Sequence, residues 1–152
     1  MTGASAKFQE CIKKGKLKTF SRGRDLADKE IRLAKEDLDS SKNSFGEENF
    51  RWSVVQAYYS MFHSARGLLY NKNYREHSHY CLIEAIRDLY VATGDLSNLS
   101  LEALIKAKQL REAADYYGDF SEINAKRLLK SAEEFMEESE KIVKKEKDCP
   151  KI

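Results

Sequence analysis

The stretch from residue 47 to residue 70 limits the fold most strongly, because it is expected to form a helix that is apolar on nearly every side. Its apolar residues recur at spacings of three and four and cover well over half of a helical circumference: Trp52, Val55, Tyr58, Tyr59, Met61, Phe62, Ala65, Leu68 and Leu69. A helix of this kind has to be buried nearly all round. The chain therefore has to surround this segment with other helices, and Gly67 would let one of them approach closely.

The rest of the chain predicts further helices. The only proline is Pro150, beyond every periodic segment, so no helix interior is interrupted. Periodic segments cover residues 21–42, 77–92, 97–117 and 121–146, with Ser97 or Ser100 and Ser121 as predicted N-caps and Gly94 and Gly118 as predicted stops. Residues 71–76 are expected to be a polar connection. The sequence thus predicts an all-α fold, a single-domain up-and-down bundle of four to five antiparallel helices.

Charge divides the chain into a basic beginning and a mildly acidic body. Residues 1–24 have a net charge of +6, whereas the whole chain has only +2. We expect residues 1–20 to be a basic, flexible leader, residues 21–147 to be the bundle, and residues 148–152 to be a tail. The leader is either a solvated segment or an arm that touches phosphates.

The cysteines and the apolar content indicate a chain of the cytoplasm. Cys11, Cys81 and Cys149 are odd in number, widely spread and free of any CxxC pair, so neither a zinc ribbon nor a disulfide framework is indicated. We expect them to be free thiols. No stretch approaches the roughly 20 apolar residues of a membrane span, and residues 1–20 show no secretory signal.

Several polar side chains stand out on the most apolar segment. Tyr59, His63, Arg66 and Tyr70 are spaced by four, three and four residues, which places them on one face of a helix. A buried arginine is costly unless it is paired or solvated. Arg66 is therefore expected either to pair with Asp115, which would lock two helices in register, or to bind an outside anion.

The stretch QLREAADYY, residues 109–117, supplies the other candidate residues. Arg111 and Asp115 lie one turn apart, but arginine before aspartate is the weaker orientation, so helix stability gives little reason for the pair. Tyr116 lies about 140° around the helix from Arg111. We expect these two side chains to share a site only if the helix unwinds near Gly118 or if a second subunit completes the site. The candidate ligand-binding residues are Tyr59, His63, Arg66, Arg111, Asp115 and Tyr116.

Other chemistry is poorly supported. The side chains of His77 and His79 diverge by about 200° on a helix, and no acidic third ligand is suitably spaced. We expect no metal site there, but an exposed pair at a helix start. The chain has no glycine-rich phosphate loop, no serine triad with local support and no Cys-His signature, so no cofactor is expected.

The strings YYSMFHSARGLL and LREAADY, followed by a final long helix, resemble the HEPN domain family over roughly residues 21–145. More specifically, they resemble the small prokaryotic HEPN proteins encoded beside minimal nucleotidyltransferases. The resemblance implies a helical bundle, commonly a homodimer, that binds a nucleotide or RNA. In many members it also implies metal-independent RNA cleavage as the toxin of a toxin–antitoxin pair. A tyrosine near the motif can be a target of the paired transferase, which would make Tyr116 or Tyr117 the candidate.

Ribonuclease members carry an arginine, four to six further residues and then a histidine. Arg111 matches the arginine, but Tyr116, Tyr117 and Gly118 fall where the histidine would stand. Histidine, with an ordinary pKa of about 6.5, can exchange protons at neutral pH, whereas tyrosine, at about 10, is nearly always protonated. We therefore favour a non-catalytic HEPN partner of a nucleotidyltransferase. The alternatives are a ribonuclease toxin that uses Arg111 with His63 or Tyr116, and a purely structural helical dimer.

Overall fold

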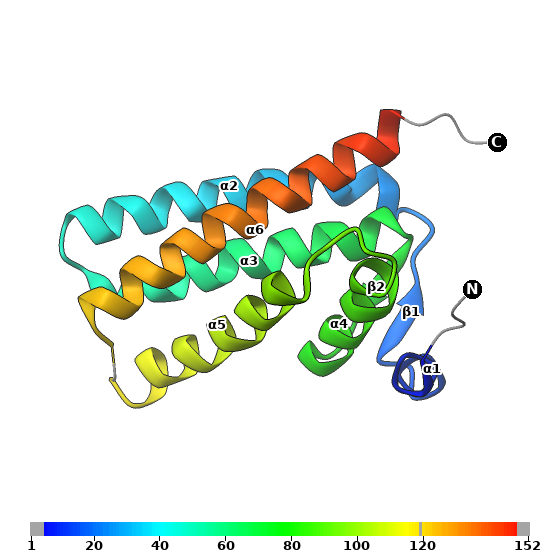
Figure 1. The fold of residues 1–152 in the computed structure, drawn as a ribbon, viewed down its shortest axis with the longest axis horizontal. Coiled ribbons are helices and arrows are strands. Elements are labelled where there is room, and N and C mark those ends of the chain that lie inside the picture. Colours follow the sequence, from blue (N-terminus) through cyan, green and yellow to red (C-terminus); the bar gives the residue numbers. More distant parts are fainter. Residues whose placement is uncertain (1–4, 119, 149–152) are drawn as a thin grey trace.

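Four long helices pack together as a bundle in the computed structural model (Figure 1). The structure describes residues 5–118 and 120–148. In chain order the elements of this part are α1 (Ala6–Lys13), β1 (Leu17–Thr19), α2 (Gly23–Gly46), α3 (Phe50–Asn71), β2 (Tyr74–Glu76), α4 (His79–Ile86), the π-helical turn η1 (Arg87–Val91), α5 (Asn98–Tyr116) and α6 (Glu122–Asp148). The expected all-α bundle is confirmed, and a two-stranded sheet is added to it. No helix among the described residues has the length and apolar character that crossing a membrane requires.

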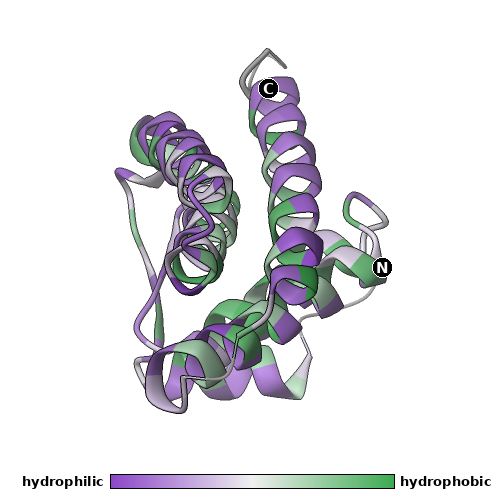
Figure 2. Ribbon diagram, turned by 90° about the vertical axis from the view of Figure 1, so that its left-hand side faces the viewer, coloured by the Kyte–Doolittle hydropathy of each residue, from purple (hydrophilic) through white to green (hydrophobic). Residues whose placement is uncertain are grey.

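Helix α3 is the central helix, as the sequence predicts. It packs against α2, α4, α5 and α6, and Met61, Leu68 and Leu69 are fully buried. Hydrophobic residues lie mostly on the sides of the long helices that face one another, and hydrophilic residues lie on their outer sides (Figure 2). Two members of the predicted apolar set depart from this pattern, because Trp52 is 48% exposed and Tyr59 is 36% exposed.

Small side chains bring α2 and α3 close together. A Cβ atom on Gly67 would lie 3.1 Å from Ile31 Cδ1, so glycine is what permits this approach, as expected. Buried serines then join the two backbones: Ser41 Oγ donates to Ser53 O at 2.7 Å, and Ser60 Oγ donates to Ala34 O at 2.8 Å. Buried hydroxyls need such partners, so these bonds fix how the two helices lie along each other.

Most predicted helix ends are confirmed by their caps. Ser97 Oγ accepts from Ser100 N, Ser121 Oγ accepts from Asn124 N, and Gly94 has the positive φ of 82° that glycine favours. The segment predicted as a polar connection, residues 71–76, contains strand β2 instead. It pairs antiparallel with β1, with Leu17 opposite Glu76 and Lys18 opposite Arg75.

The first 20 residues are not a flexible leader where the structure describes them. Helix α1 and strand β1 lie beside α4 at one end of the bundle (Figure 1), and Leu17 is 1% exposed. A disulfide joins Cys11 to Cys81, with their Cα atoms 5.8 Å apart. The expectation of free thiols is therefore wrong for these two residues, while Cys149 and residues 149–152 of the expected tail lie outside the described residues. A strand of three residues and a pair of cysteines 70 positions apart leave no periodic signal in the sequence.

We expect the disulfide to stabilise the fold by limiting the unfolded chain. Replacing Cys11 and Cys81 with serine should lower the free energy of unfolding by about 2–4 kcal/mol, because a loop of this length loses much of its entropy when it is closed. Urea denaturation followed by circular dichroism measures this effect. Dithiothreitol should destabilise the wild type and leave the double variant unchanged. Equal stability of oxidised wild type and variant would contradict the expectation.

The start of α2 gives a second test. Gly23 lies against the end of α3, where an added Cβ would collide with the backbone oxygen of Tyr70 and approach Asn73 Cα to 3.0 Å. Gly23→Ala should therefore cost about 1–3 kcal/mol of stability. Gly46→Ala is the matched control, since nothing lies within 4 Å of its added Cβ. If both variants melt at the same temperature as the wild type, the close packing at Gly23 is wrong.

Candidate functional site

Arg111 occupies the place where the second half of α5 crosses the first half of α3. Its Nη2 lies 3.3 Å from Tyr59 Oη and 3.4 Å from Asp115 Oδ2. Its Cζ lies 5.7 Å from the ring centres of both Tyr58 and Tyr59 and 5.9 Å from that of Tyr116. A guanidinium among aromatic rings at such distances gains cation–π attraction. The structure thus brings together four of the six predicted ligand-binding residues: Tyr59, Arg111, Asp115 and Tyr116.

A second arginine, which the sequence analysis missed, completes this group. Arg51 Nη2 lies 3.2 Å from Asp115 Oδ1, and Arg51 Nε donates to Ala114 O at 3.3 Å. One carboxylate therefore stands between two guanidinium groups, and the three side chains together carry one positive charge. Arg51 lies in the first turn of α3, where a charged residue is common and therefore gives no sign of a functional role. We call Arg51, Tyr58, Tyr59, Arg111, Asp115 and Tyr116 the Arg111 cluster.

One hydrogen-bond donor of the Arg111 cluster has no partner among the described residues. Arg111 Nε is buried and makes no hydrogen bond to the described residues, although a buried donor without a partner is costly. Two aromatic side chains beside the guanidinium groups are open to solvent: Tyr116, next to Arg111, is 68% exposed, and Trp52, next to Arg51, is 48% exposed. Guanidinium groups match phosphate and carboxylate oxygens, and aromatic rings offer faces for a flat base. The chemistry of the cluster suits an anionic ligand with an aromatic part.

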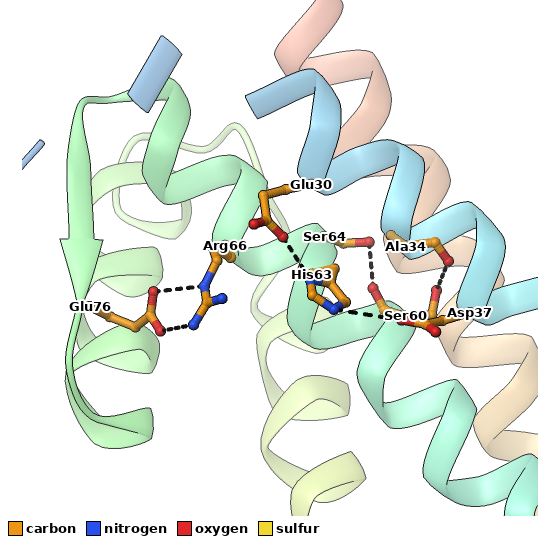
Figure 3. A network of polar contacts seen from close by, with 8 residues as sticks. All are labelled: Glu30, Ala34, Asp37, Ser60, His63, Ser64, Arg66 and Glu76. Atoms are coloured by element: carbon orange, nitrogen blue, oxygen red, sulfur yellow. Dashed lines mark hydrogen bonds and ion pairs between the residues drawn. The ribbon is translucent and has the colours of Figure 1, made fainter. Parts of the chain in front are cut away.

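Arg66 does not pair with Asp115, contrary to one of its two expectations. Instead its Nε and Nη2 donate to both carboxylate oxygens of Glu76, at 3.1 and 2.7 Å (Figure 3). The side chain of Glu76 is only 6% exposed, so this pair is largely closed off from water. Glu76 belongs to β2, which the sequence analysis did not predict. Arg66 is therefore separate from the Arg111 cluster and already has its anion.

His63 is also separate from the Arg111 cluster. Its Nδ1 lies 2.6 Å from Glu30 Oε2 and its Nε2 lies 3.7 Å from Asp37 Oδ2, both on α2 (Figure 3). Burial raises the pKa of the Asp37 carboxyl, while His63 acts in the opposite direction. Both ring nitrogens thus face acidic residues of α2, which leaves neither for a reaction beside Arg111.

The face of α3 that the sequence grouped together is shared among three neighbouring elements. Tyr59 contacts α5, His63 contacts α2 and Arg66 contacts β2, while Tyr70 is buried against Phe20. Spacings of three and four residues place side chains on the same half of a helix. They do not decide which neighbour each side chain meets when several elements surround that helix.

Tyr116 reaches Arg111 within one chain and without unwinding. Helix α5 continues to Tyr116, and the ring still lies 5.9 Å from the guanidinium carbon. The expectation that this contact needs a frayed helix or a second subunit is wrong. The angle between two helix positions gives only the directions in which their Cβ atoms leave the backbone. The arginine side chain is long enough to bring its guanidinium to the Tyr116 ring despite that angle.

His79 contacts the Arg111 cluster through Tyr58. Its Nδ1 lies 3.3 Å from Tyr58 Oη, and its Nε2 is buried with no partner among the described residues. Burial, assisted by Lys108, lowers the pKa of His79 to about 4. The ring is therefore neutral at physiological pH, and the expectation of an exposed pair of histidines is wrong for His79, while His77 is exposed. The described residues include no group of three or more His, Cys, Asp or Glu side chains that could hold a metal ion.

The lowered pKa makes an acid-dependent prediction. Because the unfolded chain binds a proton at His79 near the ordinary value of 6.5 and the folded chain only near 4, stability should fall as the pH drops through this window. The loss attributable to His79 should reach at most about 3 kcal/mol. His79→Gln should remove it in urea denaturation series at pH 7 and pH 4.5. His77→Gln is the control and should keep the wild-type pH dependence; identical profiles for all three proteins would contradict the assignment.

Comparison with known proteins agrees with this architecture. The model of the HEPN domain matches residues 27–142. A protein of Methanocaldococcus jannaschii named "Putative toxin" is 32% identical over 115 residues, 75% of this chain and 86% of its own length. A UPF0332 protein of Archaeoglobus fulgidus is 31% identical over 121 residues, 76% of this chain and 93% of its own. A UPF0332 protein of Thermotoga maritima is 27% identical over 114 residues, 74% of this chain and 86% of its own.

The matched range contains most of α2, all of α3, α4 and α5, and most of α6, and it leaves out α1 and β1. It also contains every residue of the Arg111 cluster. The extent of this match and the helical bundle lead to the same conclusion: the chain belongs to the HEPN domain family.

Proposed function

We propose that this chain is a nucleotide- or RNA-binding HEPN protein of the toxin type, and that the Arg111 cluster is its binding site. The observation that carries the proposal is the state of Arg111, whose buried Nε lacks a partner while its guanidinium carbon lies within 6 Å of three tyrosine rings. A phosphate would bind the partly exposed guanidinium groups of Arg111 and Arg51, whose side chains are 22% and 41% exposed. A base would stack on the exposed Tyr116 or Trp52. The toxin name of the M. jannaschii relative supports the broader classification.

A non-catalytic role agrees best with the side chains around Arg111. Cutting RNA without metal needs groups that take and give a proton near neutral pH. His63 is held by two carboxylates of α2, and His79 lies behind Tyr58, a residue only 6% exposed. Burial raises the pKa of Tyr58 to about 12, so its hydroxyl does not ionise at neutral pH. The remaining candidate for the ribonuclease alternative is Tyr116, which is exposed beside Arg111.

We also propose that the chain works with a minimal nucleotidyltransferase and forms a homodimer, as its resemblance to the paired HEPN proteins implies. The hydroxyl groups of Tyr116 and Tyr117 support the first part, because both residues are more than two thirds exposed and are accessible to a modifying enzyme. Light scattering of the purified protein tests the dimer. Co-purification with the product of a neighbouring transferase gene tests the partnership.

Variants of the Arg111 cluster test the binding site. Arg111→Ala should weaken binding of ATP, measured by calorimetry, and of a labelled single-stranded RNA, measured by fluorescence anisotropy, by about tenfold or more, because hydrogen bonds to charged groups contribute about 1.5–3 kcal/mol. Asp115→Asn should bind at least as tightly as wild type, because it removes the negative charge that competes with the ligand. Arg32→Ala on α2 is the matched control and should bind normally.

The outcomes separate the three possible functions. If the wild type binds neither ligand and both Arg111→Ala and Asp115→Asn are less stable, the cluster serves packing and the structural alternative holds. If the wild type cuts RNA in the presence of EDTA and Arg111→Ala does not, the ribonuclease alternative holds. Equal loss of binding in Arg111→Ala and Asp115→Asn would also contradict the proposal, because it would indicate that the Arg111–Asp115 ion pair, rather than the positive charge of Arg111, is what matters.

A further inference from the structure

The outer face of the β1–β2 sheet carries positive charges in opposed positions. Side chains alternate between the two faces of a strand, and Leu17 and Glu76 occupy the buried face. Lys18 and Arg75, which are direct cross-strand partners, therefore lie on the outer face and are exposed. One pair further along, His77 N donates to Lys16 O at 2.8 Å, and both residues are again exposed. We call Lys16, Lys18, Arg75 and His77 the ribbon face.

Nothing within the described part of the chain neutralises the ribbon face. Neither Lys16 nor Lys18 nor Arg75 makes an ion pair with a described carboxylate, whereas Lys35, Lys42 and Lys72 each do. Glu76 is the acidic residue of this sheet, and it is turned inward to Arg66. Like charges directly opposite each other destabilise a strand pair. An anion from outside would remove this repulsion.

The ribbon face is held in place before any ligand arrives. The disulfide between Cys11 and Cys81 ties the segment in front of β1 to α4. The ring of Phe8 packs edge-on against Tyr74, with centroids 5.6 Å apart. The guanidinium of Arg75 lies 5.6 Å from the centre of the Phe20 ring, which limits its freedom. Side chains that are already ordered lose less entropy when they bind a partner.

The charge distribution favours a long polyanion as that partner. Residues 1–24 carry a net charge of +6, and Lys13 and Arg22, which stand before and after β1 in the sequence, are also exposed. Lys16, which directly precedes β1, and Lys18 are two positions apart, about 7 Å in an extended chain. This is comparable to the separation of successive phosphates in a nucleotide chain. None of the large exposed hydrophobic residues belongs to the ribbon face, so it lacks the apolar anchors of a membrane-binding surface.

We propose that the ribbon face binds the phosphate backbone of RNA as a second contact, outside the Arg111 cluster. Lys16 and Lys18 precede the range that matches the HEPN domain, whereas Arg75 and His77 lie within it. The choice of RNA over another polyanion rests on the proposed function. In this arrangement the Arg111 cluster holds one nucleotide, and the ribbon face holds the backbone of the same or a neighbouring RNA segment without reading its sequence.

The test compares two pairs of substitutions in the oxidised, full-length protein. Lys18→Gln with Arg75→Gln should weaken binding of labelled poly(U) by about tenfold at low salt and should reduce the slope of log K against log salt by about 1.4, the value for two lost single-strand phosphate contacts. Arg127→Gln with Lys130→Gln on α6 is the matched control, since both of these residues are exposed. It should leave affinity and slope unchanged. Circular dichroism melts confirm that both variants are folded.

Each result decides between the two sites. Binding of ATP should be unchanged in the ribbon variant, because ATP is too short to need a second contact. If Arg111→Ala loses ATP binding but the ribbon variant binds poly(U) like the control, the ribbon proposal is wrong and the proposed function stands. If the ribbon variant loses poly(U) binding while the wild type does not bind ATP, the ribbon proposal stands alone. Absence of poly(U) binding by the wild type overturns it, as does binding to phosphatidylserine vesicles that exceeds binding to poly(U).

Discussion

The need to bury α3 on nearly every side governs the rest of this structure. Its contact with α2 is made of glycine, alanine and serine, and the serine hydroxyls bond across to the neighbouring backbone. These small side chains let the two backbones approach closely, while His63 also faces α2 through Glu30 and Asp37. Tyr58 and Tyr59 lie on the side of α3 that faces α4 and α5, where they meet His79 and Arg111. The candidate site is in this sense a consequence of how the core is packed.

The charged side chains of the three polar groups around α3 are paired in different ways. The pair of Arg66 with Glu76 is bidentate and largely closed off from water, and His63 lies between two carboxylates. Both groups hold elements together and have no capacity left for a ligand. The Arg111 cluster differs because two guanidinium groups share one carboxylate and one N–H group lacks an acceptor. This excess of donors over acceptors is what makes the Arg111 cluster, rather than the other two groups, the candidate binding site.

Periodicity and caps were enough to predict the long helices, the central place of α3 and the residues at several helix ends, since these depend on local sequence. The extension before α2 was not predictable, because its strand is three residues long and its cysteine partner is 70 positions away. For the site, Arg111, Asp115 and Tyr116 come from one local segment and were found together. Arg51, which belongs to the cluster, and His79, which contacts it through Tyr58, were missed because they come from other elements. Only the packing of α3 against α4 and α5 brings them there.

The disulfide is connected to the Arg111 cluster through His79. Cys81 follows His79 by two residues in the first turn of α4. His79 in turn contacts the hydroxyl group of Tyr58, a member of the Arg111 cluster. The disulfide therefore fixes the start of α4, the helix end that contacts Tyr58. A relative that lacks the segment before α2 has to secure this helix end by other contacts. Reducing conditions would remove this covalent link, so we expect the thiol balance of the surroundings to affect how Tyr58 is held beside Arg111.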